Sequence, residues 1–220
     1  MKSNNILLKV CLVMFGVTLC SLVVSAQTME GFSIQEISDS VFARMKGKSF
    51  PDHCTVARSD LRYLQMLHVD AKGKTHLGEM VCNKAIAEDV LEIFQELYRQ
   101  KYPIERMRLI DEYDADDEQS MRDNNSSSFC YRVVEGSTKL SKHAQGMAVD
   151  VNTLYNPCVR KRKDGSVLVQ PSTAKRYTNR SRKFPYKIVE GDLMFRLFTE
   201  HGFQWGGHWK SLKDYQHFEK

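Results

Sequence analysis

The chain has 220 residues, of which 42% are hydrophobic and 27% are charged, and its formal net charge is +5. This length is sufficient for a hydrophobic core, and the hydrophobic fraction excludes a disordered chain. Twelve glycines and five prolines exclude collagen-like and low-complexity designs. Because no repeat or long linker interrupts residues 27–220, we expect them to form a single domain.

An apolar segment near the start of the chain predicts an export signal. Lys2 and Lys9 flank the first apolar residues, and 12–24 is nearly free of polar side chains. Val24-Ser25-Ala26 then supplies the small residues typical of a cleavage site. The sequence therefore predicts a signal peptide over residues 1–26, with an uncleaved anchor as the alternative. Cleavage would leave a bacterial periplasmic or secreted protein without a membrane span.

Four cysteines follow the predicted signal, namely Cys54, Cys82, Cys130 and Cys158. An even number of cysteines in an exported chain predicts disulfides, for which three pairings are possible. Free buried thiols are the alternative. The chain contains no C-x-x-C pair, so a cysteine zinc site is not expected.

The first half of the domain carries patterns of both strands and a helix. Residues 27–60 have weak periodicity and are expected to wrap around the outside. Residues 61–69 and 75–81 flank a glycine-containing turn and predict two paired strands. Apolar residues at helical spacing predict a helix over 84–101, capped by Asn83. Pro103 is expected to end it.

The second half contains shorter patterned segments. Residues 104–110 predict a strand, and 111–128 predict a polar, acidic loop. The basic segment 159–183 contains the turn pair Asp164-Gly165 and predicts a hairpin. A helix is expected from a cap at Asp192 to His201, with Gly202 as its stop. Since strands and helices do not alternate regularly, we expect an α+β fold, with a central antiparallel sheet flanked by helices.

Two distant segments supply the residue types of a metal site. His143 and Asp150 lie seven positions apart, which is too far for one ion on a straight helix or strand. Gly146 between them permits a tight bend. Alternation with Val149 and Val151 directs Asp150 away from the packed face. The sequence therefore predicts that the His143 and Asp150 side chains converge.

His217 completes a predicted ligand set for one catalytic zinc ion. Three protein ligands leave a fourth position open for water, which is the arrangement of catalytic zinc sites. Asp214 precedes His217 by three residues, so a single turn or tight loop would make their side chains neighbours. We expect Asp214 to act as the general base. The alternative is that these histidines and acids form unrelated polar contacts.

The combined motifs resemble a known group of zinc peptidases. S-x-H-x6-D starts at Ser141 and D-x-x-H-F-E starts at Asp214, with G-G-x-W just upstream of the second motif. The chain is similar in these motifs to zinc D-Ala-D-Ala carboxypeptidases, D-Ala-D-Ala dipeptidases and phage L-alanyl-D-glutamate endolysins. The similarity covers about residues 104–157 and 185–220, which we take as a catalytic core within 104–220. It implies the Hedgehog/DD-peptidase-like fold, which lysostaphin shares.

The resemblance also implies a role for individual side chains. The implied zinc ligands are His143, Asp150 and His217. Asp214 is the implied base, and Ser141 is implied to hydrogen-bond the substrate. Arg132 would polarise the scissile carbonyl or hold the substrate carboxylate, in place of the arginine of a G-Y-R motif that this chain lacks. Trp209 is expected either to line the substrate groove or to pack in the core, and His208 to lie at the surface or behind the ligands.

These expectations together describe an exported zinc metallopeptidase that acts on the stem peptides of peptidoglycan. D-alanyl-D-alanine carboxypeptidase-like action is the first expectation. An L-Ala-D-Glu endopeptidase and a zinc-binding module without catalysis are the alternatives. The basic segment 159–183 has few interleaved aromatic residues, so we expect no nucleic-acid partner. We expect a monomer.

Overall fold

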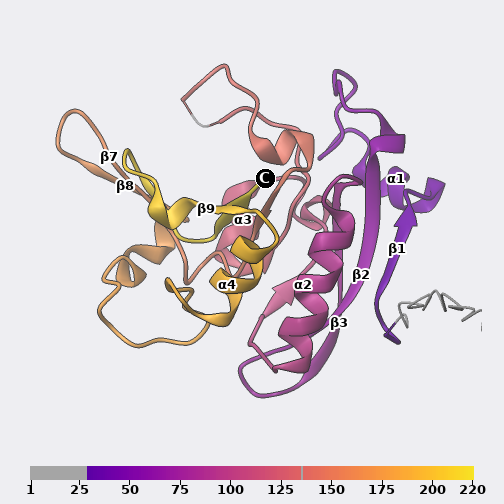
Figure 1. Ribbon diagram of the computed structural model, residues 1–220. Helices are drawn as coiled ribbons and strands as arrows, with labels where there is room; N and C mark the ends of the chain where they lie inside the picture. Colours follow the sequence, from indigo (N-terminus) through magenta and orange to yellow (C-terminus); the bar gives the residue numbers. More distant parts are fainter. Residues whose placement is uncertain (1–28, 135) are drawn as a thin grey trace, which may run out of the picture.

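The computed structural model describes residues 29–134 and 136–220 (Figure 1). The predicted signal peptide over residues 1–26 lies outside them. Within the described residues helices and strands do not alternate regularly, which confirms the α+β class. The strands of this part form three small antiparallel sheets and one parallel pair, where one central antiparallel sheet was expected.

The first sheet joins the predicted hairpin to a strand from the N-terminal segment. Its antiparallel order is β1 (Ser33–Glu36), β2 (Leu61–Val69) and β3 (Thr75–Asn83). Both hairpin strands lie where the sequence predicted them. The N-terminal segment supplies an edge strand and the helix α1 (Asp39–Met45), which buries Val41 and Met45 against a small apolar cluster.

Helix α2 (Ala87–Arg99) packs along this sheet (Figure 1). Its buried stripe consists of residues at helical spacing, namely Val90, Ile93, Phe94 and Leu97. The helix begins at Ala87 and not at Lys84 as predicted. The reason is local, because the Asn83 side chain accepts a hydrogen bond from the Ala85 amide at 3.0 Å and so closes a turn ahead of the helix.

The segment after α2 differs most from its prediction. The strand predicted over 104–110 is reduced to β4 (Arg106–Met107), which pairs in parallel with β5 (Asn125–Ser126). The predicted acidic loop contains β5 and a short helix, α3 (Asp117–Arg122). Asp116 caps this helix by accepting a hydrogen bond from the Gln119 amide at 3.0 Å. The acidic residues thus stabilise a helix start.

Two further sheets form the C-terminal half. One has the order β6 (Ala148–Asp150), β11 (His217–Glu219) and β9 (Gln204–Trp205). The other has the order β10 (Lys213–Asp214), β7 (Cys158–Lys161) and β8 (Val167–Gln170). The β7–β8 hairpin confirms the predicted turn at 164–165 and extends away from the body of the molecule (Figure 1).

Helix α4 (Leu193–Glu200) confirms the prediction for this segment. Asp192 caps it by accepting a hydrogen bond from the Phe195 amide at 2.8 Å, and Gly202 follows its end with a φ of 83°. Phe198 of α4 stacks on Phe218 of β11, with 4.2 Å between ring centroids. No helix in the described part of the chain is long and apolar enough to cross a membrane.

The cysteines do not form the predicted disulfides. All four cysteines that the structure describes are free, and Cys82, Cys130 and Cys158 are buried. The Cys54 thiol contacts the Val56 carbonyl oxygen at 3.8 Å. The free-thiol alternative therefore holds for these residues.

A tight turn ends the 3-10 helix η3 (Lys142–Gln145) and leads into β6. Gly146 adopts a φ of 68° in this turn, and its carbonyl oxygen accepts a hydrogen bond from the Asn83 amide at 2.9 Å. A Cβ atom at Gly146 would lie only 2.7 Å from the Asn83 nitrogen. The turn therefore needs glycine both for its left-handed backbone and for the close contact with β3.

We expect Gly146→Ala to lower the free energy of unfolding by about 2–4 kcal/mol, because backbone strain and a steric clash act together. Gly165→Ala is the matched control, since Gly165 has a φ of 85° but nothing within 4 Å of the added Cβ. It should cost about 1 kcal/mol. Denaturant unfolding measures both, and equal losses would show that the contact with β3 adds nothing.

Candidate metal centre

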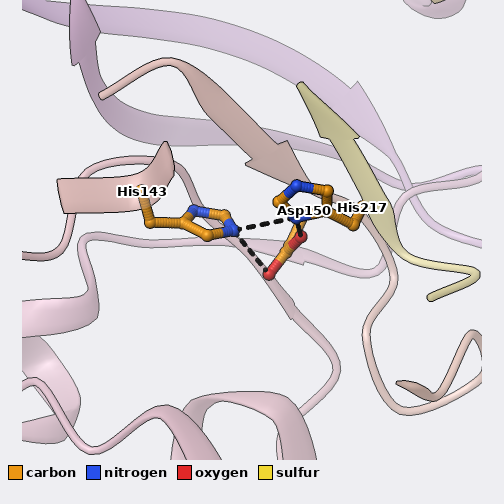
Figure 2. A group of neighbouring side chains, drawn as sticks. All are labelled: His143, Asp150 and His217. Carbon is orange, nitrogen blue, oxygen red and sulfur yellow. Dashed lines mark hydrogen bonds and ion pairs between the residues drawn. The ribbon is translucent and has the colours of Figure 1, made fainter. Parts of the chain in front are cut away.

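The side chains of His143, Asp150 and His217 meet at one buried point (Figure 2). His143 Nε2 lies 3.1 Å from Asp150 Oδ2, and His217 Nδ1 lies 3.0 Å from Asp150 Oδ1. The two ring nitrogens are 3.1 Å apart. The structure thus brings together the three residues that the sequence placed at one site.

Strand register and a helix cap position this group. Asp150 of β6 is the direct cross-strand partner of His217 of β11, so their side chains stand next to each other on one face. The neighbours Val149 and Phe218 are fully buried in the main core. His143 comes from η3, where the Ser141 hydroxyl accepts a hydrogen bond from the His143 amide at 3.2 Å.

The outer nitrogen of each imidazole is held by an acceptor. His143 Nδ1 donates to the Ser128 carbonyl oxygen at 2.7 Å, and His217 Nε2 donates to Glu219 Oε2 at 3.0 Å. Each outer nitrogen therefore carries the ring proton, and each inner nitrogen presents a lone pair. Partners of this kind fix the tautomer of metal-binding histidines.

This donor set fits a zinc ion. Two imidazole nitrogens and a carboxylate oxygen are ligands that zinc prefers, and tetrahedral bonds of their usual length place ligand atoms roughly 3.3 Å apart. The inner nitrogens and the carboxylate oxygens face one another at 3.0–3.1 Å. Because all these atoms offer lone pairs, a cation between them would relieve their mutual repulsion.

The charges within the group also favour a cation. Burial lowers the pKa of His217, but hydrogen bonds with Asp150 and Glu219 outweigh it and raise this pKa to about 10. Burial acts to raise the pKa of Asp150, yet the two histidines hold it far below its usual range. The site therefore attracts positive charge, which a proton supplies when no metal is bound.

Asp214 lies beside this group, at the end of β10. Its Oδ1 atom is enclosed and has no hydrogen-bond partner among the described residues. Burial, assisted by the nearby Asp150 charge, raises the pKa of Asp214 to about 6, although His217 opposes the shift. Such a carboxylate is a strong acceptor that retains a high proton affinity.

The G-G-x-W turn allows this close approach. A Cβ atom at Gly206 would lie 2.7 Å from the Asp214 carbonyl oxygen and 3.3 Å from His217 Cβ. Only a residue without a side chain fits there. The ring of Trp209 at the end of the turn lies 5.0 Å from the His217 ring, measured between centroids.

These residues line a cleft of about 470 Å³. The site residues expected from the sequence that contribute to its wall are Arg132, Ser141, His143, Asp150, Trp209, Asp214 and His217. Of the two interpretations of Trp209, the groove position therefore agrees with the structure. His208 is half-exposed and lies 3.4 Å from Glu190, so it is a surface residue.

Arg132 is anchored at the edge of the cleft. Its guanidinium pairs with Asp117 of α3 at 2.6 Å, and its Nε atom is buried without a partner among the described residues. Its carbonyl oxygen accepts a hydrogen bond from the Ser141 amide at 3.0 Å. The Arg132 guanidinium is thus held at the edge of the cleft, and its Nε–H group has no acceptor among the described residues.

A family model described as D-alanyl-D-alanine carboxypeptidase matches residues 135–220. The match confirms the resemblance to this family. It covers the three converging residues and Asp214, whereas Arg132 lies just before it. No curated protein and no solved structure matches the chain.

The family motifs did not reveal every residue that shapes the site. Glu219 stands in D-x-x-H-F-E, and strand alternation from His217 could have identified it, since residues two apart share a face. The Ser128 carbonyl, the Asp117 partner of Arg132 and Cys158 opposite Asp214 carry no such signal. Only the tertiary structure brings these groups to the site.

We expect the purified protein to bind one zinc ion per chain, and His143→Ala, Asp150→Ala and His217→Ala each to lose it. Removal of one ligand leaves two, too few to hold zinc tightly. His208→Ala is the matched control, because this imidazole lies outside the group and should keep full zinc content. Elemental analysis after dialysis measures the ratio. Unchanged zinc in the three variants would refute the site.

The raised pKa of Asp214 predicts a dependence of stability on pH in metal-free protein. The pKa of an unfolded aspartate is about 3.9, so between this value and about 6 the folded state binds more protons than the unfolded state. This contribution to stability therefore falls as pH rises through that window. Asp214→Asn should raise the melting temperature at pH 7.5 in chelator, and the gain should shrink toward pH 4. A gain independent of pH would contradict the shift.

Proposed function

We propose that this protein is an exported zinc metallopeptidase that hydrolyses peptide bonds in peptidoglycan stem peptides, with D-alanyl-D-alanine carboxypeptidase-like action. The observation that carries the proposal is the buried group of His143, Asp150 and His217 beside the Asp214 carboxylate, whose Oδ1 has no hydrogen-bond partner among the described residues. The match of residues 135–220 to the carboxypeptidase family supports the reaction type. We also propose that the chain has the Hedgehog/DD-peptidase-like fold.

His143, Asp150 and His217 would hold the zinc ion of this family. Zinc in such a site supplies Lewis acidity and lowers the pKa of a coordinated water. The hydrogen bonds from His143 to Ser128 and from His217 to Glu219 fix the ring orientation in which both inner nitrogens would face the metal, which would displace the additional proton of His217. The protein thereby fixes the ligand geometry before a substrate arrives.

Asp214 would act as the general base. Its carboxylate, which lines the cleft, would accept a proton from the attacking water and later return it to the amine that leaves. A base of this kind works best when its pKa is near the operating pH, and burial moves the pKa of Asp214 in that direction. A zinc-binding module without catalysis has no need for this carboxylate.

Arg132, Ser141 and Trp209 would bind the substrate. The partly exposed guanidinium of Arg132 lines the cleft and can donate to the scissile carbonyl or to a substrate carboxylate, and the Asp117 ion pair holds it in place. The Ser141 hydroxyl already caps η3 and still faces the cleft. Trp209 supplies an aromatic wall next to His217.

The proposal includes export by residues 1–26 to the periplasm or the cell exterior, where stem peptides are found. We propose a monomer without nucleic-acid partners. The basic residues of 159–183 fall partly on the projecting β7–β8 hairpin, where a solvated surface accounts for them (Figure 1).

Digestion of purified peptidoglycan, followed by mass analysis of the fragments, tests the reaction. We expect release of terminal D-alanine by the zinc-loaded protein and none in the presence of a chelator. Fragments cut between L-Ala and D-Glu would establish the endopeptidase alternative. An absence of any cleavage by zinc-loaded protein would overturn the peptidase proposal.

Asp214→Ala tests the base. We expect this variant to keep its zinc while kcat falls by about 100-fold or more, because proton transfer in the transition state is lost. Glu190→Ala is the control, since this carboxylate lies at the surface beside His208. Normal hydrolysis by Asp214→Ala would exclude this residue as the base.

A further inference from the structure

A buried thiol lies opposite Asp214 on the neighbouring strand. Cys158 of β7 is the direct cross-strand partner of Asp214 in β10, so the two side chains share one face of the sheet. Cβ atoms in such pairs are about 4.5–5.5 Å apart. Both residues line the cleft, so the Cys158 thiol stands next to the Asp214 carboxylate on this face.

The position of Cys158 is fixed by its surroundings. It is 7% exposed, and β7 is the middle strand of its sheet, with Gln170 of β8 as its other cross-strand partner. Just after Asp214, the Tyr215 amide donates to the Pro157 carbonyl oxygen at 3.4 Å. A thiol on this framework has little freedom to move relative to the carboxylate.

The glycine turn also packs against Asp214. Gly206 packs so tightly that a Cβ atom there would lie 2.9 Å from Asp214 Cβ. The cross-strand thiol and the glycine turn therefore both flank Asp214, whose Oδ1 has no hydrogen-bond partner among the described residues. Asp214 is shorter than a glutamate, so its direction decides which atoms it reaches.

We propose that Cys158 is a positioning residue, whose S–H group donates a hydrogen bond to the Asp214 carboxylate and so directs this carboxylate at the attacking water. This inference rests on the proposed function, because it assigns Cys158 a part in the same reaction. A thiol suits this task, since it is a weak donor that directs a carboxylate without strongly stabilising its charge.

The test compares Cys158→Ala and Cys158→Ser in zinc-loaded protein. Loss of the donor in Cys158→Ala should lower kcat by about tenfold with KM and zinc content unchanged, because only the base is displaced. The hydroxyl of Cys158→Ser should restore kcat to within about threefold of wild type. Cys82→Ala is the control for loss of a buried thiol, and it should be less stable but keep its kcat.

The outcomes separate this inference from the proposed function. Wild-type kcat in Cys158→Ala, or an equal loss in the alanine and serine variants, would overturn the positioning role and leave the peptidase proposal intact. If the wild-type protein cleaves no stem peptide, the infrared S–H band of Cys158 decides whether the thiol contacts the Asp214 carboxylate. It should shift in Asp214→Ala, and an unchanged band would overturn the contact itself.

Discussion

The structure depends on one electrostatic constraint. The fold holds several atoms that carry lone pairs close together in a buried site. These atoms are the inner nitrogens of His143 and His217 and the carboxylate oxygens of Asp150. They lie 3.0–3.1 Å from one another. Their outer partners fix the tautomer that points each inner nitrogen at this place, and without a metal a proton on His217 supplies the positive charge. Only positive charge at this point makes the arrangement favourable, and the surrounding elements hold it in place.

Two small sheets supply different side chains to the cleft. The β6-β11-β9 sheet carries Asp150 and His217, and the β10-β7-β8 sheet carries Asp214 with its partner Cys158. Because the short connection between β10 and β11 joins them, the carboxylate outside the ligand group stays close to it. The N-terminal sheet also supports the site, since the last residue of β3 contacts the Gly146 turn that brings His143 toward Asp150.

The predictions succeeded where local rules dominate. The 61–69 and 75–83 strands and the helix capped by Asp192 follow from alternation, helical spacing and capping, which act within a few residues. The strand predicted over 104–110 failed because only two of its residues find a pairing partner. The disulfide prediction failed because cysteine number says nothing about which thiols lie close together.

The sequence by itself determined the ligand types, the bend at Gly146 and the close spacing of Asp214 and His217, because these depend on residue chemistry and short chain segments. Only the tertiary structure decided which other groups contact the predicted ligands and Asp214. The Ser128 carbonyl meets His143, and Cys158 lies opposite Asp214, only because of backbone carbonyl position and strand register. Such contacts join residues that are distant in the chain or depend on side-chain direction, and no local pattern encodes them.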